Sequence, residues 1–366
     1  MLTSPVCAEN ALDSRLREAL SIHLDPKWGS AYWLARAAQL GFDPRVEIRS
    51  SADLPRLGIT DLADLSARAL DEFIPAMVLA SRSKLVVAQT GGTLGRPVWT
   101  AYLENEFDEA FVEPFVAAAR HVGFPLDGTW LYVGPSGPHI IGRAADAIAR
   151  RSGSAPPFMV DFDSRWAKKL PSGSFAADRY LRHVVEQAVS VLRTQPIDVI
   201  FTTPPILNAL ARELTPGQRE RIRGVHYGGM ALEPEALQRS QVEDFPNAVH
   251  LSGYGNTLFG CCLELDANAG RALRYYPYGD RLLFGVAPAE ASPGSGSATA
   301  YGAPGASGRL VFSRLDRTVL MVNVLERDEV RLVPPPGDAP RGFHLTGVES
   351  PAPVAAAGPG AAIGLY

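Results

Sequence analysis

The sequence predicts an α/β protein whose mostly parallel sheet is flanked by helices and is followed by a smaller β-rich lobe. Short apolar runs alternate with helical stretches from residue 84 to residue 257, which is the order typical of a parallel sheet covered by helices. After residue 258 the helical spacing stops, and short runs with strand character follow one another. That second pattern predicts a small barrel or antiparallel lobe.

The composition is that of a folded chain with small-molecule or protein partners. The 366 residues are 46% hydrophobic and 20% charged, a balance that excludes disorder, collagen and a coiled coil. The net charge is −4, and lysine and arginine form no cluster. The sequence therefore offers no electrostatic footprint for nucleic acid and no basic face for an anionic membrane.

The sequence carries no pattern for export or for a membrane span. The first twenty residues lack a basic region followed by an apolar one, and no apolar run reaches the roughly 18 residues of a membrane span. Cys7, Cys261 and Cys262 provide neither a disulfide framework nor a CxxC metal motif. We therefore expect a cytoplasmic protein, in which the paired cysteines are small core residues.

The patterns divide the sequence into four segments. Residues 1–80 form a helical lead-in, 81–257 the α/β core, 258–350 a small β-barrel lobe of the same core, and 351–366 a flexible tail rich in Ala, Pro and Gly. Apolar residues at helical spacing predict a helix at Ala176–Arg193. Strands of the core are expected at Leu85–Gln89, Trp130–Val133, Phe158–Phe162, Ile197–Thr202, Gly224–Tyr227 and Ala248–Leu251. Strands of the lobe are expected at Cys261–Leu265, Leu282–Val286, Arg309–Leu315, Val319–Leu325 and Val330–Val333, and a surface loop at Ala289–Ser307.

The most informative segment is Thr90–Pro97, TGGTLGRP, which directly follows the first predicted strand. Glycines allow successive backbone N–H groups to converge on an anion, threonine hydroxyls add donors, and the guanidinium of Arg96 can neutralise a phosphate. The segment matches neither the P-loop nor the GxGxxG dinucleotide fingerprint. On these residues alone, a phosphate-binding loop and a tight structural turn remain open.

Thr90–Pro97 resembles the T-S-G-T-T-G-K-P phosphate loop of the acyl-adenylate-forming (ANL) superfamily, nearest to its phenylacetate-CoA ligase branch. Further segments are similar to family motifs in the family's order, from Thr90 to Asp328, about two thirds of the chain. They are Val133–His139, Tyr227–Leu232, Tyr254–Leu258, which resembles Y-G-x-T-E, and the pair Arg309–Leu315 and Val319–Asp328. The resemblance implies the ANL core fold, ATP or AMP as the nucleotide, and activation of a carboxylate.

The resemblance also implies roles for individual residues. Those implied to act in catalysis are Thr90, Thr93, Arg96, His139 and Thr257. Those implied to contact the nucleotide are Gly91, Gly92, Gly95, Gly228, Gly229, Met230, Tyr254, Gly255, Asn256 and Asp328, the last as the acceptor of the ribose hydroxyls. On the same pattern the acyl pocket lies around His139, Ile140, Tyr227 and Gly228. Leu258 stands where the family has a magnesium-binding glutamate, so magnesium is uncertain and no metal ligand is assigned.

The sequence departs from the family after Asp328. Members continue into a mobile lid domain whose lysine bridges the carboxylate and the α-phosphate, whereas 38 residues follow Asp328 here and no lysine follows Lys169. The resemblance is therefore to a core without the C-terminal domain. Arginine substitutes poorly for a mobile lysine, so we expect slow unassisted turnover and a partner, either a reductase or an acyl acceptor. Short relatives of this kind occur in antibiotic pathways, including one that tailors phenazine carboxylates, and the chain resembles that group.

The favoured hypothesis is ATP-dependent adenylation of an aromatic carboxylate, for example a phenazine-type acid, which is then handed to a partner enzyme. One alternative is a non-catalytic protein that binds nucleotide or aryl acid in the same pathway, and another is a weak acyl-CoA ligase. A serine hydrolase is disfavoured, because Pro138 breaks the GxSxG pattern around Ser136.

Overall fold

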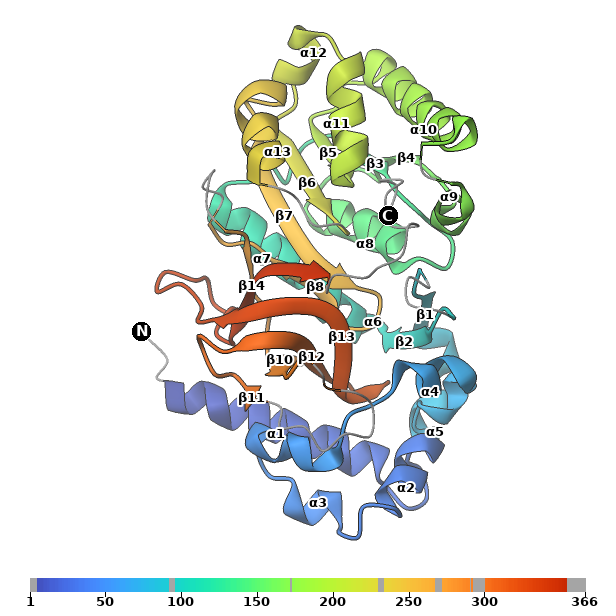
Figure 1. Ribbon diagram of the computed structural model, residues 1–366, viewed down its shortest axis with the longest axis vertical. Helices are drawn as coiled ribbons and strands as arrows, with labels where there is room; N and C mark the ends of the chain where they lie inside the picture. Colours follow the sequence, from blue (N-terminus) through green and yellow to red (C-terminus); the bar gives the residue numbers. More distant parts are fainter. Residues whose placement is uncertain are drawn as a thin grey trace. The chain divides into compact units, whose positions relative to one another are not determined.

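The computed structural model describes residues 5–91, 96–171, 173–229, 234–266, 272–289, 291 and 300–353. The chain divides into two compact units (Figure 1). Among the described residues, the first unit contains residues 5–110 and 276–353, and the second contains Phe111–Tyr275. The helical amino-terminal segment and the β-rich lobe thus share one unit, whereas the sequence patterns placed them in separate segments.

The second unit contains the parallel sheet that the sequence predicts. Its strands lie in the order β4-β3-β5-β6-β7-β8. All neighbouring pairs from β4 to β7 are parallel, and β8 runs antiparallel to β7. The strand bounds are β3 Trp130–Val133, β4 Phe158–Val160, β5 Val199–Thr202, β6 Gly224–Gly228, β7 Val249–Asn256 and β8 Gly260–Leu263. Every residue of β3 and β5 is buried, as expected for strands covered on both faces.

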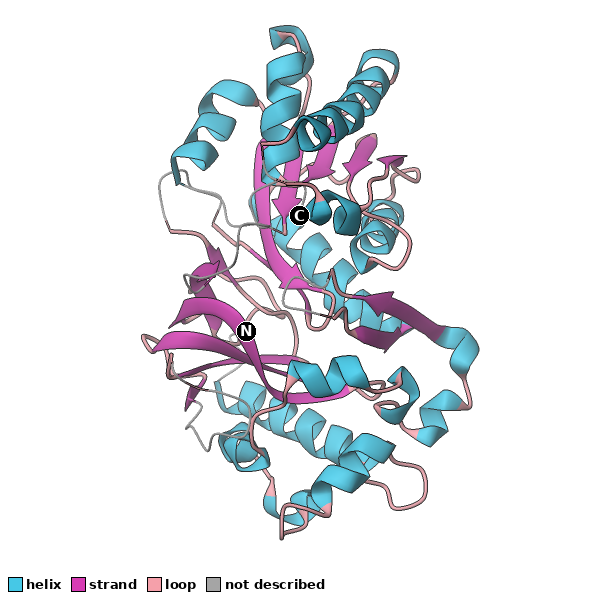
Figure 2. Cartoon of the chain, turned by 45° about the vertical axis from the view of Figure 1, so that its right-hand side comes forward, coloured by secondary structure: helices cyan, strands magenta, loops and turns pink. Residues whose placement is uncertain are grey.

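Helices cover both faces of this sheet (Figure 2). α10 and α11 contribute Val184, Ala188 and Leu210 to one apolar cluster, while Phe115 of α7 packs against Trp130 on the other face. The helices of this unit are α7 Glu113–Val122, α8 Ile140–Arg151, α9 Ser164–Lys169, α10 Phe175–Thr194, α11 Pro204–Glu213, α12 Pro216–Glu220 and α13 Pro234–Arg239. α10 confirms the predicted helix to within one residue at each end, and it begins where Ser174 accepts a hydrogen bond from the Ala177 N–H.

The first unit is built around an antiparallel sheet in which five strands follow the order β11-β10-β12-β13-β14. Their bounds are β10 Leu282–Ala287, β11 Ala300–Tyr301, β12 Ser307–Leu315, β13 Leu320–Val333 and β14 Gly347–Pro353. Its helices are α1 Pro5–His23, α2 Ala31–Ala37, α3 Pro44–Glu47, α4 Leu62–Ala67, α5 Ala76–Leu79 and α6 Glu104–Phe107. Figure 1 shows the long β13 crossing the sheet in red.

Four sequence predictions need correction. Leu85–Gln89 forms β1, but it pairs antiparallel with β2, Trp99–Leu103, and not with the parallel sheet. The predicted lobe strand at Cys261–Leu265 is β8, which closes the parallel sheet because a tight turn folds it back on β7. The two strands predicted between Val319 and Val333 are one strand, β13.

The fourth correction concerns the segments rich in Gly, Ala and Pro. Ala300–Tyr301, inside the expected loop, pairs with β10, and residues 351–353 of the expected tail belong to β14. Residues 290, 292–299 and 354–366 lie outside the described part. Strand pairing overrides composition where a neighbouring strand edge offers unpaired backbone groups.

A buried ionic network lies in the core of the first unit. The carboxylate of Asp316 is fully buried and accepts from Arg281 Nη2 at 2.7 Å and from Arg314 Nε at 2.5 Å, with Arg15 Nη2 at 3.4 Å. The guanidinium of Arg314 also lies 3.6 Å from the centre of the Tyr102 ring. These arginines hold the pKa of Asp316 well below its ordinary value, so the carboxylate is charged at neutral pH.

Among the helices that the structure describes, none combines the length and the apolar character needed to cross a lipid bilayer.

Candidate functional site

A cavity opens in the second unit at the carboxyl ends of the parallel strands. It is lined where β3, β5, β6 and β7 end, at Gly134, Thr203, Gly229 and Thr257, among others, and its empty volume of about 600 Å³ is partly open to solvent. Side chains and loops that follow parallel strands converge at this edge, which is where open α/β sheets bind ligands.

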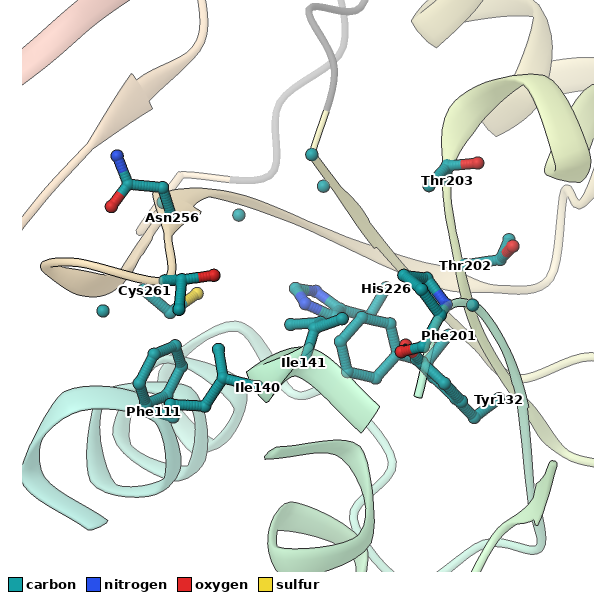
Figure 3. A pocket seen from close by; sticks show the side chains of 18 of the residues that line it. Phe111, Tyr132, Ile140, Ile141, Phe201, Thr202, Thr203, His226, Asn256 and Cys261 are labelled. Carbon is teal, nitrogen blue, oxygen red and sulfur yellow. The ribbon is translucent and has the colours of Figure 1, made fainter. Parts of the chain in front are cut away.

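One side of the cavity is aromatic and aliphatic. Tyr132 and Phe201 pack edge to face with their ring centres 5.3 Å apart, and Phe201 meets the His226 ring in the same way at 4.3 Å. Ile140 and Ile141, from the first turn of α8, add aliphatic surface (Figure 3). The Tyr132 hydroxyl donates to the Pro135 carbonyl at 2.9 Å, so this wall presents mainly carbon to a ligand and suits a flat apolar group.

His226 brings a polar group into this apolar wall. Its Nδ1 lies 2.8 Å from the Leu251 carbonyl oxygen. A carbonyl can only accept, so Nδ1 carries a proton and donates. Burial lowers the pKa of His226 to about 4, because an imidazolium would lose its hydration there. The ring is therefore neutral at physiological pH.

Two glycines keep the cavity open. A Cβ on Gly253 would lie 3.0 Å from His226 Cε1 and 3.3 Å from Cys261 Sγ, and a Cβ on Gly228 would lie 2.7 Å from the Gly253 carbonyl oxygen. A larger residue at position 253 would fill the space beside His226, and one at position 228 would collide with the backbone of β7. Burial raises the pKa of the Cys261 thiol to about 12, so this sulfur lines the cavity as a neutral thiol and not as a nucleophile.

The turn between β7 and β8 forms another part of the lining. Asn256 Oδ1 accepts from the Leu258 N–H at 2.9 Å and from the Phe259 N–H at 3.1 Å, which fixes the turn that presents Asn256 and Thr257 to the cavity. Leu258 is 3% exposed and belongs to the apolar core. A hydrocarbon side chain offers no oxygen to a metal at this position.

Several predicted site residues come together in the cavity. Those that line it are Gly228, Gly229, Gly255, Asn256 and Thr257, together with Ile140 of the predicted acyl pocket. His139 lies just before Ile140, is buried, and has Nε2 3.3 Å from the Ser164 hydroxyl. Tyr254 lies beside the cavity-forming turn, where its ring packs 5.7 Å from the Tyr275 ring. Their proposed contacts with carboxylate and adenine remain predictions.

Tyr227 does not line the cavity, contrary to the sequence expectation. Its side chain belongs to the apolar cluster beneath α10 and α11, whereas His226 and Gly228 face the cavity. Successive side chains of a strand point to opposite faces, so a strand that turns Gly228 toward the cavity must turn Tyr227 away and His226 toward it.

The other predicted site residues lie in the first unit or outside the described part. Thr90 closes the loop between β1 and β2: its N–H donates to the Val98 carbonyl and its Oγ1 accepts from the Val98 N–H, both at 2.9 Å. Gly91 follows it, Arg96 is exposed, and Asp328 lies in β13 with Oδ1 3.6 Å from Arg327 Nε. Gly92, Thr93, Gly95 and Met230 lie outside the described residues.

Several lining residues that shape the cavity were not predicted from the sequence, among them Phe111, Phe201, His226 and Cys261. The signal for His226 was present, because it precedes Gly228 by two positions in a buried strand and so shares its face. No comparable signal marks Phe111, which is distant in sequence from the strands whose ends it meets.

Within the described residues, no three Asp, Glu, His or Cys side chains converge in a way that could hold a metal ion.

No protein-family model matches the chain, and no curated protein matches its sequence. Its structure is similar to that of 2-hydroxyisobutyryl-CoA ligase in complex with 2-HIB-AMP and CoA in the thioesterification state. The TM-score is 0.64 at 17% sequence identity, over 95% of this chain and 68% of the ligase chain. The two proteins share a fold. An open conformation of the same ligase, again with 2-HIB-AMP and CoA, gives a TM-score of 0.64 at 16% identity over 95% of this chain and 75% of the ligase.

The ligase in its postadenylation state with 2-HIB-AMP gives a TM-score of 0.63 at 16% identity, over 95% of this chain and 67% of the ligase chain. The fold expected from the sequence, a mostly parallel sheet flanked by helices with an additional β lobe, is therefore confirmed.

The shifted pKa values of four buried groups predict that the free energy of unfolding is highest near pH 6.5. Burial lowers the pKa of His23, His226 and His250 from 6.5 to about 4 and raises that of Glu264 from 4.5 to about 8. Between pH 4.5 and 6.5 the unfolded chain binds three more protons at the histidines and one fewer at the glutamate. Stability should therefore fall by roughly 3 kcal/mol per pH unit as the pH drops through this window.

Above pH 6.5 only the Glu264 effect remains among these groups, so stability should fall gently toward pH 8. Urea unfolding measured from pH 4.5 to 8 tests both slopes. Glu264→Gln should remove the decline above pH 6.5 and leave the steeper acid limb in place. A flat profile across the whole range would contradict these assignments.

Proposed function

We propose that the chain uses ATP to activate an aromatic carboxylate as its acyl-adenylate. The observation that carries this proposal is the cavity at the carboxyl ends of β3, β5, β6 and β7, whose turn residues Asn256 and Thr257 belong to the segment that resembles the family's adenylate motif. The shared fold supports it, because the similar ligase was solved with an acyl-adenylate, 2-HIB-AMP.

In this reaction a carboxylate oxygen attacks the α-phosphorus of ATP, the bond from that phosphorus to the bridging oxygen breaks, and pyrophosphate leaves. Catalysis then depends on positioning and on compensation of charge. We assign the acyl group to the cavity and the α-phosphate to the hydroxyl of Thr257. Thr90, Thr93 and Arg96 keep their proposed phosphate contacts, and Asp328 its proposed ribose contact.

The proposed substrate is a flat aromatic acid. The rings of Phe111, Tyr132 and Phe201 supply aromatic surface, and glycines at 228 and 253 leave room beside it. A phenazine-type acid and a smaller phenylacetate-type acid are the two sizes to compare, since the sequence resembles proteins that act on both classes.

We further propose that a partner completes the reaction. Residues 170–366 contain no lysine, so the donor that bridges carboxylate and α-phosphate in the resembled family has no counterpart in that stretch. Losing one preorganised donor typically costs about 10²–10³-fold in rate. The proposed acceptor of the activated acyl group is a reductase or another acyl-accepting protein.

Pyrophosphate release tests the proposal. Purified protein with ATP, MgCl₂ and an aromatic acid should release pyrophosphate in an acid-dependent manner, slowly alone and faster with the protein that accepts the acyl group. Omission of the acid is the background control. The absence of pyrophosphate, AMP and adenylate with every acid, with and without partner proteins, would refute the proposal.

One observation favours a second candidate function, a non-catalytic protein that binds aryl acids. Leu258 places a buried hydrocarbon where the resembled family has a metal-binding glutamate. Calorimetry separates the two functions: tight binding of an aryl acid that ATP leaves unchanged, without pyrophosphate release, identifies the binding protein. A CoA-dependent thioester product would instead identify a weak acyl-CoA ligase.

A further inference from the structure

The cavity contains one neutral ring nitrogen that the fold leaves available to a ligand. His226 uses Nδ1 to donate to the Leu251 carbonyl at 2.8 Å. No hydrogen-bond partner for its Nε2 is found among the residues that the structure describes. Nε2 lies 3.6 Å from the position that a Cβ on Gly253 would occupy, and Gly253 and His226 both line the cavity.

The fold fixes which hydrogen-bonding role this nitrogen can play. Because Nδ1 keeps the proton and the buried ring is neutral, Nε2 has a lone pair and no hydrogen. It can accept a hydrogen bond but cannot donate one. In Figure 3 the His226 imidazole lies between Cys261 and Phe201, so a group that reaches Nε2 also meets the aromatic wall.

The other buried histidines of the described residues do not share this arrangement: His139, for example, does not line the cavity and has Nε2 3.3 Å from the Ser164 hydroxyl. His23 uses both nitrogens within the fold, with Nδ1 3.3 Å from the Ser30 hydroxyl and Nε2 3.0 Å from the Asp316 carbonyl oxygen. His250 has Nε2 3.4 Å from the Phe245 carbonyl oxygen and does not line the cavity. A histidine that serves only the fold has no need of a ligand cavity beside its second nitrogen, so the position of His226 indicates a role in recognition.

We propose that His226 determines specificity by accepting, through Nε2, a hydrogen bond from a hydroxyl or N–H group on the ring of the aromatic acid. This inference rests on the proposed function for the choice of an aromatic carboxylate. It adds that the preferred acid carries a donor on the ring and that an unsubstituted ring leaves Nε2 unpaired. An unpaired buried acceptor lowers affinity because its hydration is lost without replacement.

Calorimetry without ATP tests the inference independently of adenylation. The probes are an unsubstituted aryl acid and two matched pairs derived from it. The hydroxyl derivative is matched with its methyl ether, and the amino derivative with its dimethylamino counterpart; the methylated member of each pair lacks the donor. The wild-type chain should bind a donor-bearing acid about 10- to 100-fold more tightly than its donor-free match. Whether the hydroxyl or the amino derivative binds more tightly identifies the donor.

Three variants give the controls. His226→Phe keeps an aromatic ring beside Phe201 and should abolish the preference, while His226→Gln can present a carbonyl oxygen as acceptor and should restore part of it. His250→Phe changes a buried histidine away from the cavity and should keep the full preference. A preference that survives in His226→Phe, or equal wild-type affinities for donor-bearing and donor-free acids, would overturn the inference.

A spectroscopic measurement on the wild-type chain covers the case in which His226→Phe fails to fold. With ¹⁵N-labelled histidine, the Nε2 resonance of His226 should shift on addition of a donor-bearing acid and stay in place with the donor-free match. An Nε2 signal that is protonated in the free protein would contradict the acceptor role. These readouts are binding signals, so a donor preference without pyrophosphate, AMP or adenylate, with and without partner proteins, would refute the proposed function and leave this inference standing.

Discussion

Replacement of Asp316 by alanine is expected to lower the free energy of unfolding by about 3–5 kcal/mol, because it leaves buried guanidinium groups without their counter-charge. Asp316 is fully buried, and it pairs with Arg281 at 2.7 Å and Arg314 at 2.5 Å. Arg281 and Arg314 are themselves 2% and 0% exposed. Neither can reach water when the carboxylate is removed, so the lost attraction is not replaced by hydration.

Urea unfolding at pH 7 measures this effect. Asp146→Ala is the matched control, because Asp146 forms an exposed ion pair with Arg150 at i and i+4 on α8, which contributes only about 0.3–0.5 kcal/mol. A difference of several kcal/mol in the free energy of unfolding is expected between the two alanine variants. Equal losses would mean that water reaches the Asp316 network and that the core of the first unit is not closed around it.

The second large effect is expected at the cavity itself. In Gly253→Leu the new side chain would project toward His226 and Cys261, whose nearest atoms lie 3.0 and 3.3 Å from the position of its Cβ. The branched side chain would occupy the space assigned to the aryl ring. We expect the affinity for an aromatic acid to fall at least about 100-fold, which corresponds to about 2.7 kcal/mol.

Gly217→Ala provides the control for this change. A Cβ at Gly217 meets nothing within 4 Å, so that variant should bind the acid as the wild type does. The thermal midpoints of both variants distinguish a filled cavity from a misfolded unit. Unchanged affinity in a folded Gly253→Leu protein would show that the acid binds outside this cavity.

The sequence predicted the strands of the parallel sheet well, because their periodicity is a local property. Trp130–Val133 agrees with β3 at both ends, and the helical spacing around Val184 and Leu192 defines α10. Pairing is not local. The sequence of the strand at Leu85–Gln89 resembles those of the other strands. It nevertheless pairs antiparallel with the strand that begins at Trp99, because the connection between the two is short.

Contacts between residues that are far apart in the sequence were equally unpredictable for the buried ion pairs and for the site. Asp316, Arg281 and Arg15 meet only because the first unit brings the start of the chain to β12 and its neighbours. The segment Tyr254–Thr257 lies where β7 ends, and it lines the cavity through Asn256 and Thr257. His226 was not among the predicted site residues, because its place in the lining depends on which face of β6 the cavity occupies.

Adenylation of an aromatic carboxylate by this chain is tested most directly by the transfer of ¹⁸O from the labelled carboxylate to AMP. Adenylation joins a carboxylate oxygen to the α-phosphorus, and hydroxylamine then attacks the acyl carbon, which releases that oxygen with AMP. Adenylation of the carboxylate predicts AMP that carries one ¹⁸O atom and an aryl hydroxamate in equal amount. Unlabelled AMP, or no AMP at all in the presence of the proposed acyl acceptor, would contradict it.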